Sequence, residues 1–335
     1  MHIGRLLNIL RMRTESLYWV LTEELKALGM KPEFDYDNWI YVDNSSPIML
    51  VAHIDTVSRN QKLKFRVKKD KIKARNSVLG ADDRAGVYAI MEILNICKSK
   101  NIPMPSILFT NYEECGLIGV DDFIKAKKME KNMNIFIELD RKGENEFVFY
   151  SDTLPKEVEE WVTSFGFVEQ WGSMSDVMSL TNEYKVPHVN VSVGYYEQHS
   201  KDEYLIISEL ETNINRVMEM ILNPITELYE VEPSRFGSMM GYGFNRGFNT
   251  NDYYNRNACE YGYGYENSFD RMSPIDSPDC IYLDKFQPKV FSYVMEIDEL
   301  MELDYEPENA DIPWEEDPLV VDEYFETYGW DGYER

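Results

Sequence analysis

Five short clusters of histidine and carboxylate residues recur along this chain, and each one follows a strand-like run of apolar residues. In an open α/β sheet, ligands bind outside the carboxyl ends of the strands. Apolar runs that repeatedly end in such side chains therefore predict one edge of one sheet that converges on a metal site. The clusters are His53-Ile54-Asp55, Asp82-Asp83, Glu113-Glu114, Asp140 and His199.

The His53 cluster has the residue types of a zinc site, because histidine and carboxylate side chains are the ligands expected in zinc hydrolases. Asp55 lies two residues after His53 and therefore points to the same side of a strand. A carboxylate there can accept a hydrogen bond from the second imidazole nitrogen, which fixes the tautomer of the ring. Taken alone, a core histidine at a strand end is the alternative interpretation.

The two carboxylate pairs differ in how strongly they indicate a metal. Asp82 and Asp83 lie between a turn and an expected helix, where acidic residues usually cap the helix and interact with its dipole. Glu113 and Glu114 end an apolar strand, and adjacent carboxylates repel each other unless a cation or a proton separates their roles. One of these two can bind a metal while the other faces a metal-activated water.

Other residues are candidates for the surroundings of the site. Asp140 closes a further strand, and Glu138 shares its face as a weaker candidate ligand. Ser175-Asp176 precedes an apolar helix and indicates first a helix cap, with lining of the cleft as the alternative. Tyr195-Tyr196 precedes His199, so these tyrosines either wall a substrate pocket or serve packing. His188 begins a strand, and we expect it to be structural.

Strand and helix patterns alternate through the first 225 residues. This alternation predicts an α/β fold with three αβα layers, in which helices cover both faces of a mixed, mostly parallel central sheet. The expected strands are two within 37–53, then 106–112, 133–139, 146–150 and 188–193, with a separate hairpin over 62–74. The expected helices are 14–28, 84–98, 119–127, 155–164, 174–183 and 205–222.

The composition changes near Pro224, which predicts three parts of the chain. Residues 1–225 are the expected catalytic domain. Residues 226–295 read as a low-complexity linker rich in Gly, Asn and Tyr. Residues 296–335 carry 16 acidic residues and one basic residue, which predicts a largely disordered acidic tail that could bind a protein partner.

The charge balance excludes some partners. The chain has 34 basic and 60 acidic residues, a net charge of −26, which argues against nucleic acid and against an anionic membrane surface. No uncharged run approaches the ~20 residues of a membrane helix. The four cysteines show no CxxC spacing, so we expect reduced thiols and a soluble, cytoplasmic protein.

Four segments resemble, in order, the motifs of the co-catalytic di-zinc exopeptidases. That superfamily contains aminopeptidases, tripeptidases, carboxypeptidases and N-acyl amino-acid deacylases. The resemblance covers about residues 47–222. The matching segments are Val51-Ala52-His53-Ile54-Asp55-Thr56-Val57, Gly80-Ala81-Asp82-Asp83-Arg84-Ala85-Gly86, Thr110-Asn111-Tyr112-Glu113-Glu114-Cys115-Gly116-Leu117 and His199-Ser200-Lys201-Asp202-Glu203.

The resemblance implies a role for each motif residue. It implies two zinc ions bridged by Asp82, one completed by His53 and Asp140, the other by Glu114 and His199, with Glu113 as general base. It also implies a cis peptide bond after Asp82. Asp55 and Asp82 are 27 residues apart, and Asp140 and His199 are 59 apart. Neither interval has room for the lid domain of many relatives, so we expect the compact form without a lid.

These implications favour a zinc-dependent metallopeptidase that removes terminal residues from short peptides, most simply from the amino end. A deacylase or amidase on N-acyl amino acids is an alternative, because amide hydrolysis is the same chemistry at the metals. A non-catalytic binding protein of the same fold is the alternative from a different class. It predicts a missing ligand or base, whereas every motif position is filled.

Overall fold

The computed structural model describes residues 2–232, except 36, 58–62, 128, 130–132 and 173. Most of the predicted linker 226–295 and all of the predicted tail 296–335 lie outside the described residues. The packed chain continues past residue 225, because Val231 is buried and its backbone N–H donates to the Lys185 carbonyl at 3.1 Å.

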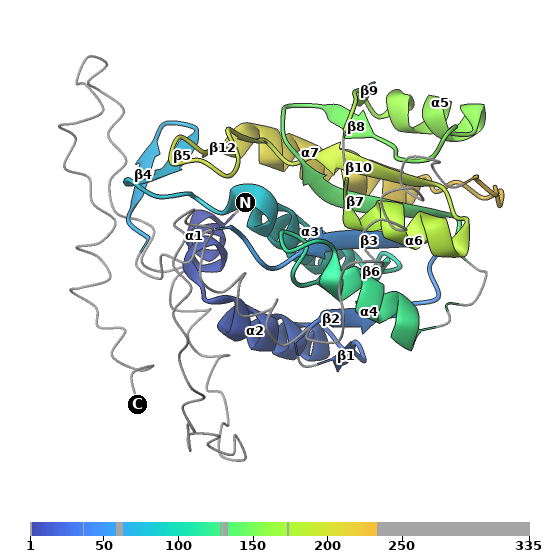
Figure 1. The fold of residues 1–335 in the computed structure, drawn as a ribbon, viewed down its shortest axis with the longest axis horizontal. Helices are drawn as coiled ribbons and strands as arrows, with labels where there is room; N and C mark the ends of the chain where they lie inside the picture. Colours follow the sequence, from blue (N-terminus) through green and yellow to red (C-terminus); the bar gives the residue numbers. More distant parts are fainter. Residues whose placement is uncertain are drawn as a thin grey trace, which may run out of the picture. The chain divides into compact units, whose positions relative to one another are not determined.

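An eight-stranded mixed sheet forms the centre of the fold (Figure 1). Its four middle strands run parallel to one another, and antiparallel pairs occur towards both edges. The prediction of a mixed, mostly parallel sheet is confirmed. The strand order is β1 (Glu33–Asp35), β2 (Trp39–Val42), β6 (Ser106–Thr110), β3 (Ile48–His53), β7 (Ile135–Arg141), β10 (His188–Ser192), β8 (Glu146–Val148) and β9 (Val168–Glu169).

Helices cover both faces of this sheet, as the three-layer prediction requires (Figure 1). Along β3, Leu50 and Ala52 pack into one apolar core, while Met49 and Val51 pack into the other. Side chains alternate between faces along a strand, so a continuous apolar run serves both cores. The helices on the Leu50 face are α1 (Ile3–Arg11), α2 (Thr14–Ala27), α3 (Ala81–Lys100), α5 (Lys156–Ser164) and α7 (Ile207–Leu222). Those on the Met49 face are α4 (Ile118–Ala126) and α6 (Asp176–Tyr184).

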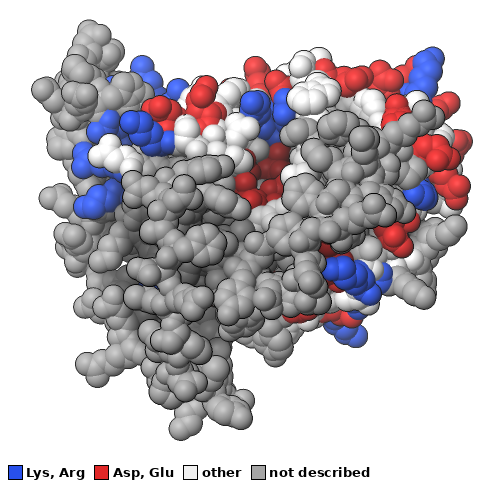
Figure 2. All heavy atoms as spheres, viewed as in Figure 1, with Lys and Arg blue, Asp and Glu red and all other residues white. Residues whose placement is uncertain are grey.

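A second, four-stranded sheet has the order β11 (Tyr195–Tyr196), β12 (Tyr204–Ile206), β5 (Lys71–Ala74) and β4 (Phe65–Lys68). The predicted hairpin is confirmed, because β4 pairs antiparallel with β5. Figure 2 shows lysine and arginine side chains gathered over this hairpin, which has seven basic residues between positions 63 and 75.

The predicted helix 205–222 begins two residues too early. Leu205 and Ile206 belong to β12 and pair with Ile72 and Lys71 of β5. Helix α7 starts at Ile207. These positions form a strand because pairing with a distant strand outweighs the local helical period of apolar residues.

Helix α1 was not predicted, and a buried arginine from the motif region holds its end. The Arg84 guanidinium donates to the carbonyls of Leu10, at 2.9 Å, and of Met12. These carbonyls lie at the carboxyl end of α1, where the helix leaves acceptors unpaired. Burial lowers the pKa of Arg84 to about 10. The side chain therefore fastens α1 to the start of α3.

Three further predictions concern the chain as a whole. Among the described residues, no helix is long and apolar enough to cross a membrane. The described residues between Asp55 and Asp82 hold the β4–β5 hairpin and no separate lid domain. The prediction of reduced thiols is wrong for Cys115, which is disulfide-bonded. Cys97 is a free, buried thiol, and the other two cysteines lie outside the described residues.

Candidate metal centre

The structure brings all seven predicted site residues to one edge of the central sheet, where its parallel strands end. β3 ends at His53, β7 carries Asp140, and Glu113-Glu114 follows β6. Asp82 lies in the first turn of α3, and His199 lies in the turn between β11 and β12. This is the convergence that the repeated apolar runs predicted.

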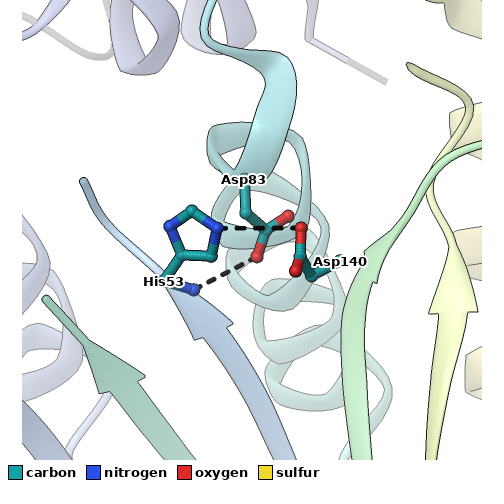
Figure 3. Close-up of side chains that lie close together, drawn as sticks. All are labelled: His53, Asp83 and Asp140. Atoms are coloured by element: carbon teal, nitrogen blue, oxygen red, sulfur yellow. Dashed lines mark hydrogen bonds and ion pairs between the residues drawn. The ribbon is translucent and has the colours of Figure 1, made fainter. Parts of the chain in front are cut away.

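The first group of side chains surrounds the His53 ring. Its Nε2 atom lies 3.2 Å from Asp82 Oδ1, 3.7 Å from Asp140 Oδ1 and 4.0 Å from Glu113 Oε2. Figure 3 shows the ring at the end of β3, with one nitrogen directed at the Asp140 carboxylate on β7. A histidine from one strand and carboxylates from a neighbouring strand and a helix therefore face a common point.

The second group surrounds His199. Its Nε2 atom lies 3.1 Å from Asp82 Oδ2 and 2.7 Å from Glu114 Oε1. The two oxygens of Asp82 thus face different histidines, which is the arrangement that a bridging carboxylate requires. Hydrogen bonds to Asp82 and Glu114 raise the pKa of His199 to about 10.

Asp55 orients the residues beside it. Its Oδ1 atom lies 3.2 Å from His53 Nδ1, on the ring nitrogen that faces away from the other carboxylates. The same carboxylate accepts the backbone N–H groups of Glu113 at 3.1 Å and of Glu114 at 3.2 Å. One side chain therefore fixes the positions of the histidine and both glutamates relative to one another.

The site concentrates more buried carboxylates than its two histidines can neutralise. Burial is the largest cause that raises the pKa of Glu113, Asp140 and Glu138 well above the usual range, and neighbouring carboxylates raise each further. Glu138 is fully buried, and neither of its carboxylate oxygens has a hydrogen-bond partner among the described residues. Buried like charges this close are stabilised by a cation or by protons.

The donor set fits zinc. Ligand atoms lie within 4.8 Å of one another in three groups, and the donors are imidazole nitrogens and carboxylate oxygens, which zinc prefers. The groups are His53 with Asp83 and Asp140, His53 with Glu113 and Glu114, and Asp82 with Glu114 and His199. Because His53 and Glu114 each occur in two of these groups, the three groups are contiguous.

Asp83 is close to the site, but its oxygens serve the backbone. It accepts the His53 N–H at 3.1 Å (Figure 3). It also accepts the Gly86 N–H at 3.1 Å. A Cβ at Gly86 would lie 2.0 Å from the Leu139 carbonyl oxygen, so only glycine lets α3 approach β7 this closely. The expected cis peptide bond between Asp82 and Asp83 is confirmed.

Asp176 lies beside the site, and the sequence favoured a different role for it. Ser175 occupies the N-cap position of α6, but its side chain makes no capping hydrogen bond, so the predicted cap is wrong. Asp176 is fully buried, accepts the Thr110 hydroxyl, and repels Glu113. Burial raises the pKa of Asp176 to about 7. Asp176 is therefore a buried neighbour of the candidate ligands.

The remaining candidates, two tyrosines and His188, differ in whether they lie near the candidate site. The Tyr195 hydroxyl lies 3.1 Å from Asp140 Oδ1, so this tyrosine borders the candidate site. Tyr196 turns to the other face, where its hydroxyl donates to Glu209 at 2.7 Å. The structural role expected of His188 is confirmed. Its Nε2 accepts the Tyr150 N–H at 2.7 Å, and burial lowers the pKa of His188 to about 3.

Comparison with known proteins matches the motif region to one family. The model of Peptidase family M28 matches residues 40–187. Aminopeptidase PepT from Bacillus cereus ATCC 10987 has a similar solved structure, with a TM-score of 0.54 and 17% identity over 65% of this chain and 96% of that one. A tripeptidase from Staphylococcus aureus subsp. aureus Mu50 has a TM-score of 0.54 and 16% identity over the same shares. The family model covers 148 of the 335 residues, so it relates the motif region of this chain to a peptidase family.

At these identities the solved structures show a shared fold alone, and the family match stops before His199. A curated relative, the uncharacterized protein YqjE of Bacillus subtilis (strain 168), is 36% identical over 89 residues. That match spans 26% of this chain and 22% of the relative. The comparisons therefore show the fold and relate the motif region to a peptidase family, and the roles of individual residues rest on the geometry above.

Proposed function

We propose that this chain is a zinc-dependent exopeptidase of the aminopeptidase type, acting on short peptides with two zinc ions. The observation that carries the proposal is the position of Asp82, whose two oxygens face His53 at 3.2 Å and His199 at 3.1 Å. A carboxylate shared in this way by two histidines suits a pair of metals better than a single one.

The ligands divide into two sets around that shared carboxylate. His53 and Asp140 would complete one zinc position, and Glu114 and His199 would complete the other. When bound, zinc would act as a Lewis acid on a peptide carbonyl and would acidify water. Asp55 would keep His53 in the tautomer that presents Nε2 to the metal, because its carboxylate lies 3.2 Å from Nδ1.

Glu113 would act as the general base that accepts a proton from the attacking water. Its backbone is held by Asp55, and its Oε2 lies 4.0 Å from His53 Nε2, at the margin of the ligand cluster. A carboxylate placed beside the ligands, with its neighbour Glu114 facing His199, is suited to accept a proton from water and to deliver it to the departing amine.

The test compares the zinc-loaded chain with a Glu113→Gln variant. Aminoacyl-nitroanilides and short peptides with free amino ends should be hydrolysed, and Glu113→Gln should lower kcat by about 10²–10⁴-fold while zinc stays bound. Glu183→Gln, on an exposed residue at the end of α6, is the matched control and should behave as the parent.

Three results would contradict parts of the proposal. Hydrolysis of N-acetyl amino acids without hydrolysis of aminoacyl substrates would replace the exopeptidase with a deacylase. Full activity in Glu113→Gln would remove Glu113 from its proposed role. A zinc-loaded chain that turns over neither substrate class would favour the non-catalytic binding protein.

A further inference from the structure

One buried carboxylate holds the segment that carries Asp82. Glu203 is fully buried, and its two oxygens accept four consecutive backbone N–H groups. Oε2 accepts those of Leu79 and Gly80, both at 2.9 Å. Oε1 accepts those of Ala81 at 2.8 Å and Asp82 at 3.1 Å. The bridging candidate is therefore fastened through its own amide.

The same glutamate ends the turn that carries His199, four residues earlier. The turn is tight: the Ser200 hydroxyl donates to the Glu197 carbonyl at 2.7 Å, and the Glu203 N–H donates to the Ser200 carbonyl at 3.1 Å. The His199 side chain is 48% exposed, so its own packing fixes it weakly. Glu203 is the buried anchor of this surface turn.

Two ligand-bearing segments that are 121–124 residues apart in sequence are thus joined by one side chain. We propose that Glu203 is a positioning residue that keeps Asp82 and His199 at ligand distance before any metal binds. This inference rests on the proposed zinc site, and Glu203 itself touches neither metal nor substrate.

A simpler role for Glu203 would be stabilisation of the amino end of α3, because helix N-termini attract carboxylates. The chain offers a matched comparison for that role. Asp70 accepts the Ser208 N–H at 2.8 Å and the Ser208 hydroxyl at 2.5 Å, at the amino end of α7. Helix α7 carries no candidate ligand, so Asp70 stabilises a helix end without positioning a metal site.

The experiment therefore uses Glu203→Gln and Asp70→Asn in the full chain. An amide offers one accepting oxygen and turns an NH₂ group towards the remaining backbone donors, so either variant weakens its helix end. Zinc affinity is measured by competition with a chromophoric chelator. We expect Glu203→Gln to lower it by about 10–100-fold and Asp70→Asn to change it by less than about twofold. Both variants should lower Tm.

Unchanged zinc affinity in Glu203→Gln, together with a lowered Tm, would overturn the inference and leave Glu203 as a helix cap. If Glu203→Gln does not fold, hydrogen exchange of the zinc-free parent decides the question. Slow exchange of the amides of residues 79–82 without metal supports positioning by Glu203, and exchange that slows only after zinc is added overturns it.

The outcomes separate this inference from the proposed function. A parent that binds zinc but hydrolyses no peptide would contradict the function, while the affinity comparison would still test Glu203. A parent that hydrolyses peptides, with normal zinc affinity in Glu203→Gln, would contradict only the inference. A parent that binds no zinc would overturn both.

Discussion

Two buried histidines lie at opposite ends of the parallel strands in the central sheet, and their surroundings differ completely. His53 is the last residue of β3, at the edge where the strands end. His188 is the first residue of β10, at the edge where the strands begin. Both lie in strands of the sheet and are fully buried, so residue type and burial are the same.

The neighbours of each histidine decide its chemistry. Burial lowers the pKa of His53, but Asp140 and the hydrogen bonds to Asp55 and Asp82 raise it well above the usual range. Burial of His188 is uncompensated, and its pKa falls to about 3. The contacts of His188 are neutral, with the Tyr150 N–H and the Thr181 hydroxyl. The His53 ring therefore lies among carboxylates in the candidate metal site, whereas the His188 ring is a neutral part of the core.

The largest expected contrast is between His53→Ala and His188→Gln in zinc-loaded protein. Loss of a ligand removes several kcal/mol of charge stabilisation, so His53→Ala should lower kcat/KM by at least ~10³-fold. His188→Gln should keep zinc and most activity. Steady-state kinetics with zinc analysis measures both effects, and a similar loss of activity in the two folded variants would remove the distinction.

A smaller effect is expected for Asp55→Asn, which tests whether the carboxylate beside His53 supports the ligand rather than binds metal. The shape is kept, but the negative charge next to the imidazole is lost. Zinc affinity should fall by about 10–100-fold, the usual range for partners of ligating histidines. Chelator competition provides the measurement, and an affinity equal to that of the parent would show that Asp55 has no such role.

The smallest effect concerns stability and pH at His188. Below its ordinary pKa of 6.5 the unfolded chain binds a proton that the folded chain excludes until about pH 3. Stability therefore falls as the pH drops through this window, by roughly 2 kcal/mol between pH 7 and pH 5. The free energy of unfolding of His188→Gln should therefore fall by roughly 2 kcal/mol less than that of the parent between pH 7 and pH 5. Urea titrations of the zinc-free proteins measure both. The same pH dependence of the free energy of unfolding in parent and variant would contradict the prediction that folded His188 stays neutral.

The sequence predicted the strand and helix order well, because long apolar runs and amphipathic helices report on the cores they fill. It also placed His53 and Asp140, since parallel strands bring their ends together without further information. Helix α1 was not predicted because Arg84, which binds the carbonyls at its carboxyl end, lies 72–75 residues away along the chain. No local pattern contains that contact.

The roles of two other carboxylates near the site, Asp83 and Asp176, were missed for the same reason. Asp83 was quoted as a motif residue, but its partners are backbone N–H groups of His53 and Gly86. Asp176 was favoured as a cap, and its actual partner, Thr110, is 66 residues away. Asp55 was predicted to orient His53 because the two residues are neighbours in one strand motif, whereas the contacts of Asp83 and Asp176 are created only by the folded chain.

The central claim is that His53, Asp82, Glu114, Asp140 and His199 hold two neighbouring zinc ions. Crystals of the zinc-loaded chain, measured at the zinc absorption edge, test it directly by anomalous scattering. The account predicts two peaks ~3.5–4 Å apart, on either side of Asp82, each ~2.0–2.2 Å from its ligand atoms. A single peak, or peaks away from Asp82, would contradict it.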